Sequence, residues 1–308
     1  MRPALARLAA ACMALVALAG AAPASPTITV PPGPFVAEGL APAQTGRGWL
    51  VGGVLTGTIL QLGDGPARTV FQVTDPDLGV YNLLADPRRH VLWASAAPRP
   101  GHTAASKLLE IDWRTGRLLA EHLGPPEAKS SFGDLMLGAD GSLYVSDSGD
   151  GRLLRLAPGA QALEVVSHGV FRSPQGLARA PGRALIVADY VRGLFVLGAD
   201  GAVAPLPLPD GRPLTGIDGL LVDGRDLIAV QNGREPNQVL ALRLDAGRRR
   251  ILKVTTLAEG PPFEQPTGIA LRGGRLAVVA HSQWEGVADG GAFQPGTGPA
   301  EIRLLPLP

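Results

Sequence analysis

A short phrase recurs six times along the chain, and this repeat limits the possible folds more than any other feature. In each copy a polar residue precedes an apolar segment, which is followed by a Gly-rich turn and another β-rich run. The mean spacing between copies is about 46 residues, a period typical of propeller blades. The polar residues that mark the six copies are Glu38, Asn82, Asp134, Gln175, Asp218 and Thr267.

The third copy shows the repeated unit most clearly. Phe132–Leu137 is followed by the turn Gly138–Gly141, the run Ser142–Asp147 and, after a second turn, the run Gly151–Leu156. Three or four short strands of this kind make one blade. The sequence after residue 24 has no helical periodicity, which excludes an alternating βαβ fold. We therefore predict an all-β chain in which residues 25–308 form a single six-bladed β-propeller; two packed β-sandwiches are the alternative.

The sixth copy predicts how the ring closes. Its expected strands lie near residues 267–271, 275–280 and 301–305, and the chain then ends without an outer strand. The β-rich run Thr27–Val30 could supply that strand. We expect this N-terminal strand to close the ring, because closure leaves no unpaired sheet edge.

The first 24 residues have the three parts of a secretory signal peptide. Met1–Arg7 carries two arginines and no acid, Leu8–Gly20 is apolar, and small residues suited to cleavage occur at 19–21 and 22–24. We expect cleavage and a periplasmic or secreted product; an uncleaved anchor helix is the alternative. The single cysteine, Cys12, lies in this segment, so the mature chain would have neither a disulfide nor a reactive thiol.

The charge balance limits the classes of partner. The chain has 28 Lys plus Arg and 27 Asp plus Glu, for a net charge of +1. This balance gives no support for nucleic acid or an anionic membrane as the partner. We expect a monomer that meets a small molecule and, after signal cleavage, no membrane.

The repeat also predicts where polar side chains gather. In a propeller, the first strand of each blade starts at one mouth of the central channel and the second strand returns to it, so the six marker residues would meet the second-strand ends there. Converging carboxylates raise each other's pKa unless a cation is present, and oxygen ligands favour Ca²⁺, with Zn²⁺ or Mn²⁺ as alternatives. Each polar residue could instead cap a tight turn. The second-strand ends include Asp189, Asn232 and His281.

Three of the copies resemble the regucalcin/gluconolactonase family of six-bladed propellers. The similar stretches are Ala37-Glu38-Gly39, Pro174-Gln175-Gly176 and Ile217-Asp218-Gly219. In that family a Glu, an Asn and an Asp at these places hold one divalent cation, and the enzymes hydrolyse sugar lactones. The resemblance implies that Glu38, Gln175 and Asp218 are metal ligands and that Asp218 is also catalytic.

The chain departs from the family pattern at two positions. Gln175 replaces the family's Asn, and Phe132-Gly133-Asp134 replaces a Phe-Asn-Asp stretch whose Asn contacts substrate or water. A second stretch, Val187–Leu194, is similar to strictosidine-synthase-like and arylesterase-like propellers. These resemblances share one fold and one mouth, and they differ in the chemistry that the mouth performs.

Two functional hypotheses follow from these residues. The first is an exported, metal-dependent hydrolase of the lactonase or esterase type. The second is a non-catalytic propeller that binds a small ligand or a protein on the same face. Glu38 with Asp218 favours the enzyme, whereas Gly133 and Gln175 favour the binding protein. In the first hypothesis the substrate is positioned by Asn82, Asp134, Asp189, Asn232, Thr267 and His281.

Two insertions near the expected mouth complete the candidates. Pro98–Ala105 extends the second copy, and the Gly-rich segment 286–298 follows Trp284 in the sixth. Each is either a lid over the mouth or a surface loop.

Overall fold

The structure is a computed structural model of the chain. It describes residues 26–44, 46, 48–63, 65–125, 129–294 and 296–307, so the expected signal peptide (1–24) lies outside the described part.

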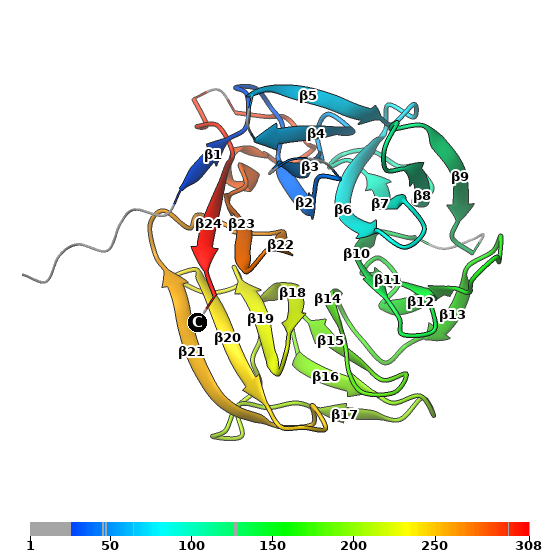
Figure 1. Cartoon of the computed structure of the whole chain (residues 1–308), viewed down its shortest axis with the longest axis vertical. Helices are drawn as coiled ribbons and strands as arrows, with labels where there is room; N and C mark the ends of the chain where they lie inside the picture. Colours follow the sequence, from blue (N-terminus) through cyan, green and yellow to red (C-terminus); the bar gives the residue numbers. More distant parts are fainter. Residues whose placement is uncertain are drawn as a thin grey trace, which may run out of the picture.

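Six antiparallel sheets of four strands each are arranged in a ring, which confirms the predicted six-bladed propeller (Figure 1). Blades one to three contain β2 (Ala37–Pro42), β3 (Trp49–Gly53), β4 (Thr58–Gly63), β5 (Gly65–Gln72), β6 (Leu78–Asp86), β7 (Val91–Pro98), β8 (Lys107–Asp112), β9 (Leu118–Leu123), β10 (Phe132–Leu137), β11 (Leu143–Asp147), β12 (Arg152–Leu156) and β13 (Glu164–Ser167).

The second half of the ring continues the pattern. Its strands are β14 (Pro174–Arg179), β15 (Leu185–Asp189), β16 (Gly193–Leu197), β17 (Val203–Pro205), β18 (Ile217–Asp223), β19 (Asp226–Gln231), β20 (Gln238–Leu244), β21 (Ile251–Glu259), β22 (Ile269–Arg272), β23 (Arg275–His281) and β24 (Glu301–Pro306). The described residues include one helical turn, the 3₁₀ turn η1 (Trp284–Gly286). No helix in this part of the chain has the length and hydropathy needed to cross a bilayer.

The N-terminal strand completes blade six, as the sequence predicts. β1 (Thr27–Thr29) pairs antiparallel with β24, with Ile28 opposite Ile302, so the sheet order is β1-β24-β23-β22. In Figure 1 the blue N-terminal strand lies beside the red C-terminal strand. Ile28 packs against a core cluster shared by blades six and one, so both pairing and apolar burial hold the ring shut.

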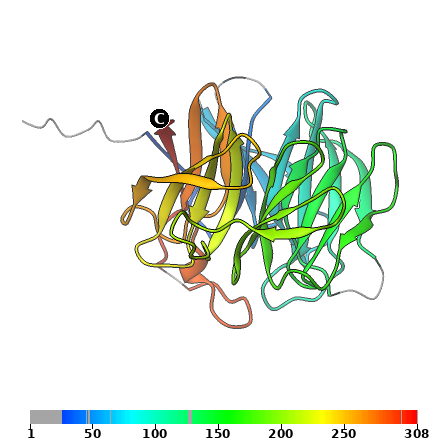
Figure 2. The same cartoon turned by 90° about the horizontal axis from the view of Figure 1, so that it is seen from below.

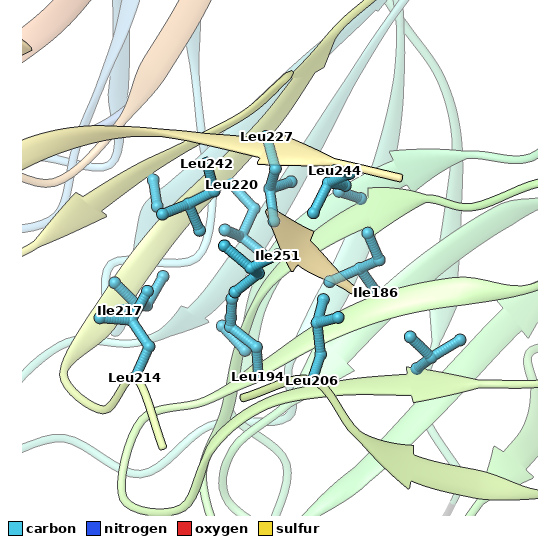
Figure 3. Packing of buried hydrophobic residues seen from close by; sticks show 14 of the residues in the cluster. Ile186, Leu194, Leu206, Leu214, Ile217, Leu220, Leu227, Leu242, Leu244 and Ile251 are labelled. Carbon is cyan, nitrogen blue, oxygen red and sulfur yellow. The ribbon is translucent and has the colours of Figure 1, made fainter. Parts of the chain in front are cut away.

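The hydrophobic core lies between neighbouring blades. The cluster between blades four and five, for example, joins Ile186 and Leu194 of one sheet to Leu220, Leu227 and Leu242 of the next (Figure 3). Aliphatic side chains fill these interfaces, which explains why a chain with only 5% aromatic residues can form a large core. The blades therefore stabilise one another through these shared interfaces.

The innermost strands approach each other closely around the channel. Each of β2, β6, β10, β14, β18 and β22 contacts the innermost strand of the next blade, and β22 contacts β2. Glycines permit this approach: a Cβ added to Gly176 would lie 2.6 Å from the Asp218 carbonyl oxygen, and one added to Gly268 would lie 2.0 Å from that of Glu38. The glycine in the repeated phrase is thus required by backbone packing between blades.

We expect Gly176→Ala to destabilise the fold by about 1–3 kcal/mol, because its new methyl would meet the backbone of β18. Gly247→Ala is the matched control, since its Cβ would meet no atom closer than 3.9 Å. Urea unfolding of both variants measures the difference. Equal midpoints would show that the interface can relax around the methyl group.

Candidate functional site

The described residues enclose a cavity of about 650 Å³ at one mouth of the channel. All six polar residues that mark the repeats line it: Glu38, Asn82, Asp134, Gln175, Asp218 and Thr267. The structure therefore brings together in space six residues that recur at roughly regular intervals along the sequence. The lining residues that sequence analysis did not assign to the mouth include Tyr81, Tyr190, Glu235 and Trp284.

A local irregularity of the innermost strands points the polar side chains inward. The pairing between first and second strand shifts register in five blades, between Ala37 and Leu40 in blade one and between Ile217 and Leu220 in blade five, for example. Such a β-bulge bends the strand and redirects a side chain. In blades one, four and five the polar residue and the glycine after it fall within this shift, so one residue enters the channel and the other lets the neighbouring strand approach.

Glu38 and Asp218 are two buried carboxylates of the cavity, and the charge of Asp218 acts on Glu38. Burial raises the pKa of Glu38 well above its usual range, repulsion from Asp218 raises it further, and a hydrogen bond from the indole of Trp284 opposes the rise. Burial raises the pKa of Asp218 to about 6, opposed by a hydrogen bond from Asn232. Both carboxylates are therefore held where their negative charge is costly.

Asn232 is part of a short network that fixes Asp218. Its amide nitrogen donates to Asp218 Oδ2 at 2.8 Å and to the Pro266 carbonyl at 3.0 Å, and its amide oxygen accepts from the Tyr190 hydroxyl at 3.0 Å. Burial and the charge of Asp218 raise the pKa of Tyr190, so this phenol stays a donor. The network leaves Asp218 Oδ1 to face the cavity.

Asp134 has a different role from the one expected, because both of its oxygens are already hydrogen-bonded. Oδ1 accepts from Asn82 Nδ2 at 2.7 Å and from the Leu135 amide at 2.9 Å, while Oδ2 accepts from the Leu177 amide at 2.5 Å. Burial nevertheless raises the pKa of Asp134 to about 7. Asp134 and Asn82 thus join blades two, three and four at the channel wall, and this use competes with contacts to a substrate.

Gln175 and Gly133 lie beside each other. A Cβ added to Gly133 would be 3.5 Å from Gln175 Oε1 and 3.1 Å from the Ser146 hydroxyl, so the longer amide lies next to the space left by the missing side chain. Thr267 is buried, and its hydroxyl donates to the Ala37 carbonyl across the seam between blades six and one. Gln175 remains available to a ligand, whereas Thr267 serves ring closure.

Asp189 and His281 do not line the cavity. Asp189 is fully buried and accepts hydrogen bonds from the amides of Arg172, Val191 and Arg192, so it caps the turn after β15. The next residue, Tyr190, faces the cavity instead.

His281 is held by the insertion of blade six. Its Nδ1 lies 2.9 Å from the Pro299 carbonyl oxygen and its Nε2 lies 2.7 Å from Glu285 Oε1. Burial lowers the His281 pKa, but hydrogen bonds to Glu285 and Pro299 outweigh it, and the net pKa is raised. The structure therefore does not place these two side chains at the mouth as the sequence predicted: each is the last residue of its strand, and its side chain is bound by the turn or insertion that follows.

The cavity is strongly acidic. Glu38, Asp134, Asp218 and Glu235 line it, and the described lining residues include no Lys, Arg or His. In the part of the chain that the structure describes, no three Asp, Glu, His or Cys side chains lie close enough to hold a metal ion by themselves. A cation at Glu38 and Asp218 would need further oxygen from the Gln175 amide, the backbone or water.

No family model and no curated protein sequence matches the chain. Solved structures of other proteins do match the chain. PQQ-bound aldose sugar dehydrogenase from Streptomyces coelicolor is 17% identical, with a TM-score of 0.64 over 92% of this chain and 99% of that one. A putative glucose dehydrogenase from Thermus thermophilus is 22% identical, with a TM-score of 0.64 over 91% and 100%.

A gluconolactonase from Xanthomonas campestris is also similar to the chain. It is 17% identical, with a TM-score of 0.57 over 94% of this chain and 99% of that one. At these identities the comparisons show a shared fold. The resemblance to regucalcin/gluconolactonase propellers therefore holds at the level of the six-bladed architecture.

The raised carboxylate pKa values predict that metal-free protein loses stability as the pH rises. Folded Asp218 keeps its proton up to about pH 6, whereas the unfolded value is 3.8, so this contribution is complete below pH 3.8 and is lost through pH 6. Urea unfolding in chelator between pH 4.5 and 8 should show Asp218→Asn with a flatter slope than the wild type, by up to about 1.4 kcal/mol per pH unit. Equal slopes of unfolding free energy against pH for the wild type and Asp218→Asn would contradict the raised pKa assigned to Asp218.

Proposed function

We propose that the chain is an exported hydrolase of the lactonase or esterase type, acting on a small molecule in the axial cavity with a divalent cation. One observation carries the proposal: Glu38 and Asp218 share a cavity whose described lining has no basic side chain. Buried carboxylates whose pKa values are strongly shifted occur preferentially at functional sites.

The donor set fits a hard cation. Glu38 Oε1 accepts from Trp284 and Asp218 Oδ2 accepts from Asn232, which leaves one oxygen of each carboxylate to bind a ligand. The Gln175 amide adds a neutral oxygen to the same cavity. Ca²⁺ prefers such carboxylate and amide oxygens, and Zn²⁺ or Mn²⁺ are the alternatives. When bound, the cation would supply a Lewis acid for the carbonyl oxygen of a lactone or ester.

The chain's own residues would then orient substrate and move a proton. The Asp218 carboxylate, which Asn232 holds at Oδ2, would accept a proton from the attacking water. Asn232 and Tyr190 hold the Asp218 carboxylate in one orientation. Trp284 holds Glu38 in the same way from the other side of the cavity.

The known neighbours of the fold support an enzyme. They include a gluconolactonase and two sugar dehydrogenases, all of which act on small molecules of sugar type by name. The second candidate is a non-catalytic ligand-binding propeller. Its support is the use of both Asp134 oxygens for contacts between blades and the absence of a side chain at Gly133.

Calcium binding tests the proposal. We expect one site by calorimetry in the mature, chelator-treated protein, and affinity lowered by at least about tenfold in Glu38→Gln and Asp218→Asn, because ligand charge sets Ca²⁺ affinity. Glu235→Gln is the control: it removes one carboxylate from the cavity without removing a proposed ligand. Equal losses in all three variants would indicate a nonspecific charge effect, and no binding of Ca²⁺, Zn²⁺ or Mn²⁺ would exclude the metal-dependent hydrolase.

The acidic cavity also predicts substrate charge. An uncharged lactone should have a kcat/KM at least about tenfold higher than the same lactone bearing a carboxylate or phosphate. Added salt should reduce this difference in kcat/KM, because it screens the charges. The Glu235→Gln variant should also reduce this difference in kcat/KM, because the substitution lowers the negative charge of the cavity. A preference for the anionic lactone would contradict this electrostatic argument.

A further inference from the structure

The insertions of blades two and six meet across the face of blade one. A Cβ added to Gly101 would lie 2.2 Å from the Gly290 carbonyl oxygen, and one added to Gly291 would lie 2.0 Å from that of Pro100. The two backbones are therefore in direct contact, although about 190 residues separate them in the sequence. We call this contact, between segments 98–105 and 286–294, the bridge. The loop between β23 and β24 projects from one face of the ring (Figure 2).

Each half of the bridge begins at an aromatic residue of the cavity. The Tyr81 hydroxyl donates to the Pro98 carbonyl at 2.7 Å, where the blade-two insertion starts. On the other side, Trp284 lies in η1, directly before the blade-six insertion, and its indole donates to Glu38. Burial and then the charge of Glu38 raise the pKa of Tyr81. Glu38 thus has one aromatic side chain from blade two and one from blade six beside it.

Both halves are internally ordered. The blade-six half is a tight hairpin, in which Val287 bridges Phe293 and the Ala288 amide donates to the Ala292 carbonyl at 2.8 Å. In the blade-two half, the His102 amide donates to the Arg99 carbonyl at 3.0 Å. A displacement at the contact would therefore be transmitted along each half instead of being absorbed by a loose loop.

The blade-six half is also fastened to blade one. The buried Gln283 accepts hydrogen bonds from the Phe35 and Val36 amides and donates to the Gly33 and Gly298 carbonyls. Val36 has φ 50° and Gln283 has φ 78°, conformations that are rare for residues with a side chain. Strained backbone next to Glu38 and Trp284 is typical of a site whose geometry is held in place.

From these contacts we infer that the bridge is a positioning element for substrate binding. It fixes Tyr81 and Trp284 on both sides of Glu38, so that together they form one wall of the cavity. The substrate part of this inference rests on the hydrolase proposed above; the positioning of Trp284 does not. The residues of the bridge do not line the cavity, and their effect on a ligand is exerted through the two aromatic side chains.

Three glycine variants test the bridge with a matched control. Gly290 and Gly291 have φ values of 81° and 86°, so alanine costs both a similar backbone strain. The methyl of Gly291→Ala would collide with Pro100, whereas that of Gly290→Ala would meet no atom within 4 Å. Gly101→Ala (φ 81°) breaks the same contact from the other half. A positioning role predicts that Gly291→Ala and Gly101→Ala behave alike and that Gly290→Ala resembles the wild type.

Two readouts separate positioning from stability. The first is acrylamide quenching of Trp284, isolated among the four tryptophans by comparison with Trp284→Phe in each background. We expect stronger quenching in Gly291→Ala and Gly101→Ala. The second is turnover of an uncharged lactone, for which we expect KM to rise by up to about 100-fold with a smaller change in kcat.

The outcomes distinguish this inference from the proposed function. If acrylamide quenches Trp284 equally in Gly291→Ala and Gly290→Ala, the bridge does not position Trp284 in the cavity wall and the inference is wrong. If quenching differs but kcat falls while KM does not change, the bridge does not act on substrate binding. If the wild type hydrolyses no lactone or ester, the proposed function fails, and the quenching comparison still decides whether the bridge positions Trp284.

Discussion

Close contact between the innermost strands is the constraint on which the rest of this structure depends. Six strands can surround one narrow channel only if their backbones approach within van der Waals distance, and glycines such as Gly176 and Gly268 make that possible. In blades one, four and five a register shift turns the residue before the glycine into the channel. Packing between blades and the gathering of polar side chains are thus two consequences of one backbone feature.

This arrangement has an electrostatic cost. Burial raises the pKa values of Glu38, Asp134 and Asp218, because the channel removes water from carboxylates without offering a basic partner among its described lining residues. Asp134 compensates with hydrogen bonds from two backbone amides and Asn82. Glu38 and Asp218 receive less compensation. The structure therefore divides its carboxylates into one that links blades and two that keep an oxygen directed to the cavity.

The sequence predicts the fold and part of the site because both follow from a periodic feature. Even spacing of the repeats identifies the blades, the incomplete sixth copy predicts closure by the run Thr27–Val30, of which Thr27–Thr29 forms the strand, and the polar markers all line the cavity. Asp189 and His281 lie elsewhere because amides of the turn after β15 bind Asp189 and groups that flank the blade-six insertion bind His281, and no repeated sequence pattern signals these local contacts. Trp284 could not be predicted as a partner of Glu38, since a non-repeating 3₁₀ turn brings it there.

Function on this fold is decided by what the mouth contains. Dehydrogenases and a gluconolactonase share the ring with this chain, so the blades alone select no chemistry. The net charge of the whole chain is only +1, yet four acidic residues line the cavity together with aromatic residues. The acids favour a cation and disfavour an anionic substrate, while Tyr81 and Trp284 give an uncharged ring an apolar surface beside Glu38. If the two insertions hold Tyr81 and Trp284 as inferred above, a change in the insertions can change the spacing of these two side chains without changing the blades. One ring can in this way accept different substrates while its carboxylates stay in place.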